Sequence, residues 1–149
     1  FNNFLLLDIE SNCTSLEDVY RNFKSCTKLE SDNKYFCENC QAKRTASKRH
    51  TIDIWPKYIN IWLKRFRHNG ITFTKNDQEI DIPLVWKDNL QLQGAIIHSG
   101  SLNGGHYVYV GKHESKWFLF NDSSINEIKS ITELKALLSK AYLLCYTRS

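Results

Sequence analysis

The spacing of apolar residues predicts a helix near each end of the chain. Apolar side chains recur at helical intervals over residues 16–23, which is typical of an amphipathic helix. Thr14 and Glu17 have the spacing of a capping box at the start of this helix. Ser130 and Glu133 form a second such pair before a short stripe of leucines, and this pattern predicts the second helix.

From Thr51 onward, apolar residues alternate with polar ones, which predicts strands rather than helices. Pro56 interrupts the first of these runs, because proline cannot donate a hydrogen bond to a strand ladder. Asn69 and Gly70 form a strong turn signal. The apolar start of the chain reads as a strand that continues a segment before Phe1. We expect strands or extended segments at residues 1–7, 51–54, 59–63, 80–83, 90–97, 106–112, 116–121 and 142–146.

Residues 35–49 are polar and basic around Cys37 and Cys40, and predict a projecting, finger-like hairpin rather than a part of the core. The expected order is therefore helix, hairpin, several strands, short helix and last strand. This order predicts an α+β fold with an antiparallel sheet rather than a series of βαβ units. With 149 residues, the chain is one domain or most of one.

The net charge of +4 is concentrated in two basic clusters, at residues 43–50 and 64–68. Such clusters raise the hypothesis of nucleic-acid binding, but no recognised nucleic-acid motif accompanies them. A solvated basic face, or a docking surface for an acidic protein segment, explains the charge as well. No apolar run approaches the about 20 residues of a membrane span, and the start lacks the features of a signal peptide. The sequence therefore predicts neither a nucleic-acid-binding protein nor a membrane protein.

The cysteine content favours a reducing compartment. Five cysteines are present, an odd number, and only Cys37 and Cys40 form a close pair. A disulfide-stabilised secreted domain usually has a denser, even set. We therefore expect an intracellular protein, in the cytoplasm, the nucleus or both, and interpret the glycosylation triplets at Asn12 and Asn121 as coincidental.

Candidate chemistry begins at His106, which follows Gly104 and Gly105 at the start of a predicted strand. A hairpin of the predicted length brings Asn121 and Asp122 beside this imidazole. A histidine held by Asn or Asp is the base half of a cysteine-protease triad, because a thiol attacks as thiolate and needs an imidazole to take its proton. Since side chains alternate along a strand, only one of the two acceptors can face His106 directly. An ordinary strand histidine is the alternative.

Gly104 and Gly105 suggest a site for a thin chain end. Residues without Cβ let another backbone pass close to His106. A narrow channel at this point would admit a Gly-Gly tail and exclude bulkier peptides. The alternative is a hairpin glycine pair with no role in binding.

Several motifs in order along the chain resemble the ubiquitin-specific protease family. The resemblance runs from about Phe4 to Tyr146, nearly the whole chain. It rests on a Cys-x-x-Cys turn, a tryptophan-containing strand segment, a histidine box and a closing strand, at residues 35–40, 46–48, 52–66, 93–100, 105–108, 117–122 and 141–146. A match of this length is far more specific than any single motif.

The resemblance implies a papain-like cysteine protease fold of thumb, fingers and palm. Residues 1–55 would belong to the fingers, and residues 56–149 to an antiparallel palm sheet. The implied activity is that of a thiol-dependent deubiquitinase, which hydrolyses the isopeptide bond after the C-terminal Gly-Gly of ubiquitin. Ubiquitin and ubiquitinated proteins are the implied partners, and no cofactor is implied for catalysis.

The resemblance also implies roles for individual residues. His106 is the general base and later the acid for the leaving lysine amine. Asn121 occupies the third position of the triad, and the adjacent Asp122 helps to position water or the oxyanion. The residues implied to contact the ubiquitin tail are Gly104, Gly105 and Tyr107.

The chain departs from the family pattern because it lacks the cysteine box and the thumb. Cys13 lies at a predicted helix start, where the helix dipole lowers the pKa of a thiol, but the resemblance places it far from His106. Cys145 reads as a small core residue in an apolar strand. We therefore expect the nucleophile on residues outside this chain. A second polypeptide that supplies it, or a half-domain kept for binding, are the alternatives.

Cys37 and Cys40 form half of a tetrahedral zinc site, with two thiolates on one turn. The second Cys-x-x-Cys of the resembled family is not in this chain. Three interpretations stay open at this point. The zinc site is completed by residues outside the chain, or it is completed by His50, Cys13 or Cys26, or the turn holds no metal.

Two other functions fit the same residues. A catalytically inactive module would hold ubiquitin or a partner protein in the palm without cleaving it. A protease for a ubiquitin-like modifier would use the same chemistry, because a channel for Gly-Gly fits the C-terminal tails of several such modifiers.

Overall fold

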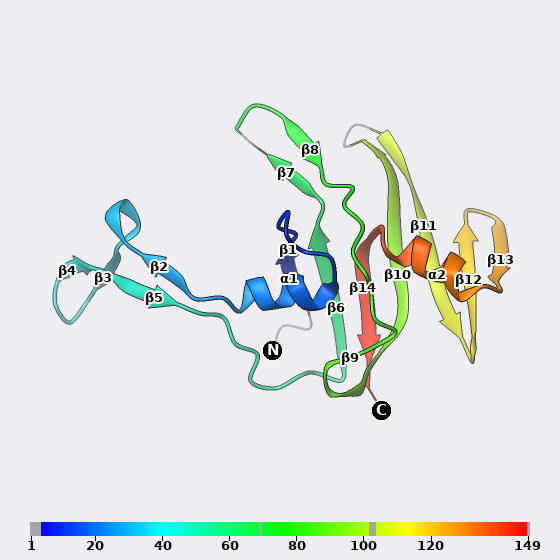
Figure 1. Cartoon of the computed structure of the whole chain (residues 1–149), viewed down its shortest axis with the longest axis horizontal. Helices are drawn as coiled ribbons and strands as arrows, with labels where there is room; N and C mark the ends of the chain where they lie inside the picture. Colours follow the sequence, from blue (N-terminus) through cyan, green and yellow to red (C-terminus); the bar gives the residue numbers. More distant parts are fainter. Residues whose placement is uncertain (1–3, 69, 102–103, 149) are drawn as a thin grey trace.

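The computed structural model describes residues 4–68, 70–101 and 104–148, which form a mixed α+β fold dominated by one large sheet (Figure 1). The helices are α1 (Leu16–Phe23) and α2 (Ile131–Leu138), and short 3-10 turns lie at Ser31–Asn33 and Lys87–Asn89. No helix within these described residues is long and apolar enough to cross a membrane. The strands are β1 (Phe4–Asp8), β2 (Thr27–Leu29), β3 (Tyr35–Cys37), β4 (Ala42–Arg44), β5 (Ala46–Lys48), β6 (Tyr58–Lys64), β7 (Phe66–His68), β8 (Phe73–Lys75), β9 (Val85–Trp86), β10 (Leu90–Ser101), β11 (Gly104–His113), β12 (Lys116–Asn121), β13 (Ser124–Ile128) and β14 (Ala141–Thr147).

The large sheet has the strand order β1-β6-β14-β10-β11-β12-β13, with the short β9 paired to β10. Neighbouring strands are antiparallel, as the sequence predicts, except at one edge, where β1 runs parallel to β6 and pairs Phe4 with Asn60. The expectation of an antiparallel sheet is therefore wrong for β1. Parallel neighbours need a long connection, and α1 together with the segment up to β6 supplies it.

One face of the sheet is buried and carries the core. The register aligns a row of fully buried side chains, which runs from Ile61 through Leu144 and Ala95 to Val110. Helix α1 packs against β1, and α2 packs against β10 and β13. The opposite face carries a second row of apolar side chains that are half-buried or exposed: Leu6, Trp62, Leu143, Ile96, Tyr109, Phe120 and Ile125.

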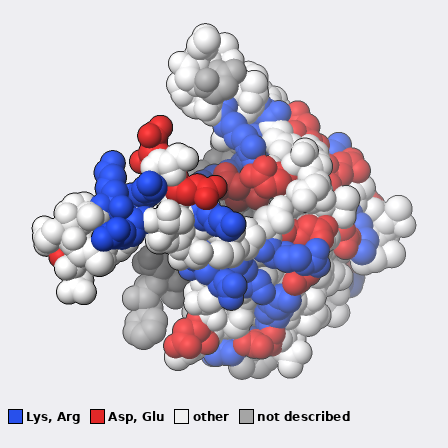
Figure 2. Space-filling model, turned by 60° about the vertical axis from the view of Figure 1, so that its left-hand side comes forward, with Lys and Arg blue, Asp and Glu red and all other residues white. Residues whose placement is uncertain are grey.

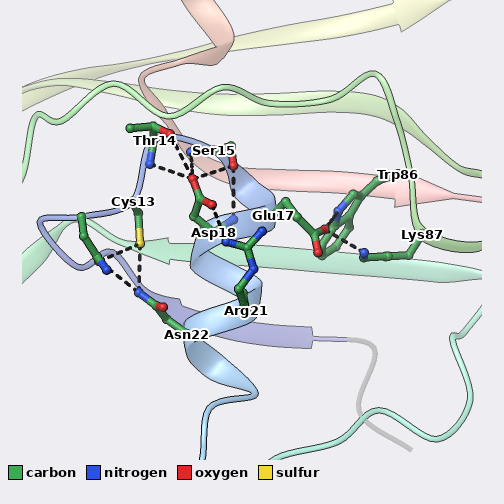
Figure 3. Close-up of polar contacts among 10 residues, drawn as sticks. Cys13, Thr14, Ser15, Glu17, Asp18, Arg21, Asn22, Trp86 and Lys87 are labelled. Atoms are coloured by element: carbon green, nitrogen blue, oxygen red, sulfur yellow. Dashed lines mark hydrogen bonds and ion pairs between the residues drawn. The ribbon is translucent and has the colours of Figure 1, made fainter.

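Helix α1 begins one residue later than the sequence predicts. Ser15 is the N-cap, and it forms the capping box with Asp18 rather than Thr14 with Glu17 (Figure 3). The Ser15 backbone is extended, with φ of −140° and ψ of 161°, which suits the cap position. Glu17 instead accepts a hydrogen bond from Trp86 Nε1 at 3.1 Å, which ties α1 to β9. The predicted helix is confirmed, but its capping pair is not.

Asp18 makes the start of α1 sensitive to acid. Its carboxylate accepts hydrogen bonds from the hydroxyls of Ser15 at 2.8 Å and Thr14 at 3.0 Å, and from both of their backbone N–H groups. These bonds, the one from the Ser15 side chain foremost, lower the pKa of Asp18 from 3.8 to about 2. Because the folded-state pKa lies below the unfolded one, the stabilisation is complete above about pH 4 and is lost as the pH falls towards about 2.

We therefore expect Asp18→Asn to lower the melting temperature at pH 7, and the difference from the unmutated protein to shrink as the pH falls from about 4 to about 2. Asp53→Asn is the matched control, because Asp53 is exposed and makes no hydrogen bond or ion pair within the described residues. Thermal unfolding followed by circular dichroism across this pH range makes the comparison. A difference for Asp18→Asn that is the same at every pH would contradict the capping account.

The predicted finger-like hairpin is confirmed as an arm, residues 27–48, which projects from the rest of the molecule (Figure 1). Antiparallel pairing of β2 with β5 forms its base, and pairing of β3 with β4 forms its tip. Every residue of the arm is exposed or half-buried, so the arm has no core of its own. Lys and Arg side chains are prominent on its surface (Figure 2).

Other segments also differ from the sequence prediction, and the short strands β2, β7, β8 and β9 are among those not expected. Residues 51–54 do not form a strand, because Trp55 turns into the core against Trp86, with ring centroids 5.4 Å apart, and leaves Ile54 exposed. Strand β13 was not predicted, since its apolar residues are few, but it pairs along the whole length of β12. The predicted turn at Asn69 and Gly70 lies between the paired strands β7 and β8, although Asn69 itself is outside the described residues.

Candidate active site

The hairpin of β11 and β12 brings His106 and Asn121 together. The register pairs Tyr109 with Phe120 and Val110 with Leu119, so His106 and Asn121 lie near the open end of this hairpin on the same face. His106 Nε2 lies 2.5 Å from Asn121 Oδ1, which is a short hydrogen bond. The predicted proximity of the imidazole and the side-chain amide is present in the structure.

This contact leaves one imidazole nitrogen for chemistry. The amide oxygen of Asn121 can only accept, so Nε2 of His106 donates the proton of the hydrogen bond. A neutral imidazole carries a single N–H, and Nδ1 therefore has a free lone pair. The His106 side chain is 48% exposed, so an approaching group can reach it. The arrangement suits proton abstraction from a thiol, a hydroxyl or a water molecule.

Asp122 lies in the turn after β12 rather than on the strand. Its φ of 50° is in the left-handed region, which Asp tolerates better than most residues. The turn brings Asp122 Oδ2 to 3.9 Å from His106 Nε2, while the side chain stays 80% exposed. The expectation that only one acceptor faces His106 holds for the direct hydrogen bond, which Asn121 makes. The strict alternation behind it does not apply to Asp122, because Asp122 lies in a turn. Its carboxylate is therefore a second acceptor beside the imidazole, and it carries a negative charge, which the Asn121 amide does not.

The two glycines before His106 differ in their surroundings. A Cβ on Gly105 would overlap the ring of His98 and lie 2.6 Å from the carbonyl oxygen of Ser99. The space that Gly105 leaves free is therefore filled by its own sheet, and not by a channel. A Cβ on Gly104 would meet nothing within 4 Å, so this position is open. Tyr107, which follows His106 in the strand, is 56% exposed and lies on the opposite face of the sheet from His106.

Cys13 does not have the surroundings of a nucleophile. Its side chain is fully buried, and its sulfur accepts a hydrogen bond from Asn22 Nδ2 at 3.3 Å (Figure 3). Asn22 lies in the last turn of α1, so the thiol is held against this helix. Strands β6, β14 and β10 separate β1, against which α1 packs, from β11. Cys13 and His106 are therefore not brought together.

Cys145 is not the small core residue that the sequence predicts. It lies on the less buried face of the sheet, where its thiol donates to Asn60 Oδ1 at 3.0 Å. Partial burial raises the pKa of this thiol, which makes the thiolate less available. Cys26 is exposed at the root of the arm. Within the described residues, the polar contacts of the His106 side chain are those with Asn121 and Asp122, and none of them is with a cysteine.

Cys37 and Cys40 lie on one turn at the tip of the arm, as a free thiol pair. The backbone and the side chain of Cys40 both hydrogen-bond to Cys37 and lower the pKa of its thiol. A lowered pKa favours the thiolate form that zinc requires. No three His, Cys, Asp or Glu side chains in the described part of the chain cluster closely enough to hold a metal ion. These residues fit half of a zinc site and do not complete it.

Two buried polar residues near the site were not singled out from the sequence. Arg65 is 2% exposed and donates to four backbone carbonyls of different segments. His98 is 7% exposed and packs under the start of β11. The only sequence feature that marks these two residues is that each follows a long apolar segment of a predicted strand. A polar residue at such a position is expected to point to solvent, so this feature did not predict their burial.

Comparison with known proteins gives a consistent family assignment. The sequence profile of the family described as ubiquitin carboxyl-terminal hydrolase matches residues 1–146. Human ubiquitin carboxyl-terminal hydrolase 3 is 31% identical over 149 residues, which cover 89% of this chain and 28% of the relative. The probable ubiquitin carboxyl-terminal hydrolase 16 of Schizosaccharomyces pombe is 32% identical over 157 residues, which cover 95% of this chain and 33% of the relative.

Solved structures of SAGA DUB modules share the fold. The yeast SAGA DUBm with an Sgf73 mutant matches with a TM-score of 0.83 and 32% identity, over 97% of this chain and 35% of that chain. A SAGA DUB module bound to monoubiquitin matches with a TM-score of 0.75 and 31% identity, over the same shares of both chains. These matches confirm the predicted papain-like α+β fold. The chain spans about a third of the length of the relatives that it matches.

Proposed function

The chain belongs to the ubiquitin carboxyl-terminal hydrolase family, and from this premise we propose that it is the histidine-bearing part of a thiol-dependent deubiquitinase. The reaction is hydrolysis of the isopeptide bond between the C-terminal Gly-Gly of ubiquitin and a lysine amine. The single observation that carries the proposal is the exposed His106 imidazole, held by Asn121 at 2.5 Å with its second nitrogen free.

The finer part of the proposal concerns the nucleophile. This chain corresponds to the C-terminal part of the catalytic domain, and the cysteine box lies on residues outside it. Supporting this, Cys13 is buried against Asn22, and the pKa of Cys145 is raised by burial. A cysteine from a second polypeptide would serve the same chemistry. Mapping the cysteine that captures an electrophilic ubiquitin, described in the Discussion, locates the thiol.

In the first step, Nδ1 of His106 takes the proton of the thiol, and the thiolate attacks the carbonyl carbon of the terminal glycine. The C–N bond to the lysine then breaks, and His106 returns its proton to the departing amine. A thioester between the cysteine and ubiquitin remains. Asn121 keeps the imidazole in the required tautomer throughout, because Nε2–H is committed to its amide oxygen.

In the second step, water attacks the thioester and His106 takes a proton from it. The C–S bond breaks and His106 returns its proton to the sulfur. The ubiquitin C-terminus leaves as a carboxylic acid, which releases the second proton of the water to solvent and becomes a carboxylate. Asp122 lies 3.9 Å from Nε2, close enough to stabilise the imidazolium that forms in both steps. We assign it that role, together with positioning of water or the oxyanion.

We place the ubiquitin tail beside the start of β11. Gly104 is open to solvent, and Tyr107 is largely exposed, so both are available for contact with a chain end. Gly105 contributes in a different way from the one expected from the sequence, because its missing Cβ accommodates His98. We assign residues 56–149 to the palm and residues 1–55 to the fingers portion. Within that portion β1 pairs into the palm sheet, and the arm, residues 27–48, is the part that projects.

Cys37 and Cys40 are proposed as a structural zinc half-site that needs two further ligands from outside this chain. The lowered pKa of the Cys37 thiol supports this role. Zinc in this position would stabilise the tip of the arm and take no part in the reaction, which needs no cofactor. Metal analysis of the full-length protein, with and without Cys40→Ser, tests the assignment.

Ubiquitin, ubiquitinated proteins and further protein subunits are the proposed partners. The likeness to a SAGA DUB module bound to monoubiquitin supports both kinds of partner. Because ubiquitin conjugates are the substrates, we propose an intracellular site of action, in the cytoplasm, the nucleus or both. No role in nucleic-acid binding or at a membrane is proposed.

The full-length protein is expected to release a fluorophore from an isopeptide-linked ubiquitin–lysine conjugate. Parallel conjugates of ubiquitin-like modifiers test the choice of tail, because Gly-Gly ends are shared among them. Turnover of the ubiquitin conjugate in preference to the others supports the proposal. Preference for another modifier reassigns the substrate, and tight ubiquitin binding without any turnover supports the inactive binding module instead.

A further inference from the structure

His98 is a buried histidine that the proposed chemistry does not use. It lies in β10, directly opposite Tyr107 of β11, and is only 7% exposed. Its Nδ1 is fully buried and has no hydrogen-bond partner among the described residues. A buried histidine with an unpaired nitrogen is unusual, because leaving such a group unsatisfied costs about 1–3 kcal/mol. The packing of its ring therefore needs an explanation.

The ring contacts both chain neighbours of His106. On one side it lies against Gly105, so closely that a Cβ at that position would overlap Nε2. On the other side it packs against the ring of Tyr107, with centroids 4.5 Å apart. His106 itself points to the opposite face of the sheet, because it stands between these two residues on the same strand. One ring therefore supports the backbone before and after the proposed base.

The ring is in turn fixed from behind. Phe66 packs against it edge-on, with centroids 5.5 Å apart. Lys75 Nζ donates to the carbonyl oxygen of His98 at 3.0 Å and pairs with Asp77 at 3.0 Å. Phe66 and Lys75 belong to β7 and β8, which pair with each other. The ring thus joins the β7–β8 hairpin to the strand that carries His106.

We propose that His98 is a positioning residue, whose ring sets the backbone on both sides of His106 and so aims the imidazole. This inference rests on the proposed function, in which His106 is the general base. The His106 side chain is half exposed and has a single direct hydrogen bond, to Asn121, so little else fixes it. A displacement of about 1 Å in a catalytic group can lower a rate by about 100-fold. Packing beneath the backbone is therefore expected to matter for the rate.

The proposal predicts an effect on turnover rather than on binding. In the full-length protein, His98→Ala is expected to lower kcat by about 10- to 100-fold and to leave KM within about threefold. His98→Phe restores a ring without the unpaired nitrogen, and its kcat is expected to lie nearer the unmutated value than that of His98→Ala. Ile96→Ala is the matched control. It removes a half-buried side chain from the same strand and face, opposite Tyr109, and should leave kcat within about threefold.

A purely structural role would lower stability in His98→Ala and Ile96→Ala alike and would not separate their kcat values. The proposal is overturned if kcat of His98→Ala stays within about threefold, if KM changes instead, or if His98→Phe is no better than His98→Ala. Nuclear magnetic resonance gives a second measurement that needs no turnover. The His106 Nε2–H signal, protected by Asn121, should exchange faster with solvent in His98→Ala and not in Ile96→Ala.

These measurements distinguish a failure of the proposed function from a failure of the positioning role of His98. If the unmutated protein shows no turnover, the proposed function fails, and the positioning role is judged by the Nε2–H exchange alone. If the unmutated protein turns over and His98→Ala matches it in rate and exchange, only the positioning role fails.

Discussion

His106→Ala in the full-length protein is expected to lower the hydrolysis of a ubiquitin–fluorophore conjugate by about 10³-fold or more. The physical reason is that the free nitrogen of His106 is the proposed acceptor for the thiol proton, and alanine leaves no group to take it. The loss should fall on kcat, because the side chain contacts the reacting atoms and does not hold the body of ubiquitin. Steady-state kinetics with the purified variant measures both constants.

His113→Ala is the control for this variant, because His113 is an exposed histidine at the far end of the same strand. Its rate should be unchanged. Asn121→Ala should lower kcat less than His106→Ala, because Asp122 lies 3.9 Å from Nε2 and can partly replace the lost acceptor. Turnover by His106→Ala within about threefold of the unmutated protein would remove this histidine from the mechanism.

Arg65→Met is expected to lower the free energy of unfolding by about 3–5 kcal/mol. The Arg65 guanidinium donates to the carbonyl oxygens of Ala141 at 2.7 Å, Ser139 at 2.8 Å, Gln78 at 2.7 Å and Asn76 at 3.1 Å. These carbonyls come from the end of α2, the start of β14 and the segment after β8. Methionine fills similar space but leaves all four acceptors without this donor.

Lys64→Met is the matched control for this substitution. Lys64 is the neighbouring cation, and it forms an exposed ion pair with Asp8 at 3.1 Å, so its loss should change stability by less than about 1 kcal/mol. Arg65→Lys should fall between the two, because one ammonium can replace part of the set of hydrogen bonds. Denaturant titration of the full-length protein gives the comparison. A change below about 1 kcal/mol for Arg65→Met would show that these hydrogen bonds do not hold the segments together.

The periodic parts of the chain were predictable because one face of each element is buried. Ile59, Ile61 and Leu63 alternate with residues of the other face, and their buried side chains belong to the core. The same pattern gave β10, β11, β12, β14 and both helices. It could not give the parallel pairing of β1, because strand direction depends on the connection and not on the local pattern.

The polar part of the site was predictable only where the residues were close along a hairpin. His106 and Asn121 face each other because one turn joins their strands, so their spacing carried the information. The glycine at position 105 indicated that space is needed beside the backbone, but not which group occupies that space. The ring of His98, from the neighbouring strand, occupies it. Arg65 could not be recognised, since its partners are backbone carbonyls of segments distant in sequence and carry no residue signature.

The central claim is that His106 activates a sulfur that this chain does not itself carry. The most direct measurement is capture of ubiquitin bearing a C-terminal electrophile by the full-length protein, with the adduct mapped by mass spectrometry. We expect one ubiquitin on a cysteine outside residues 1–149, formed much more slowly in His106→Ala. An adduct on one of the five cysteines of this chain, or equal capture by His106→Ala, would contradict the account.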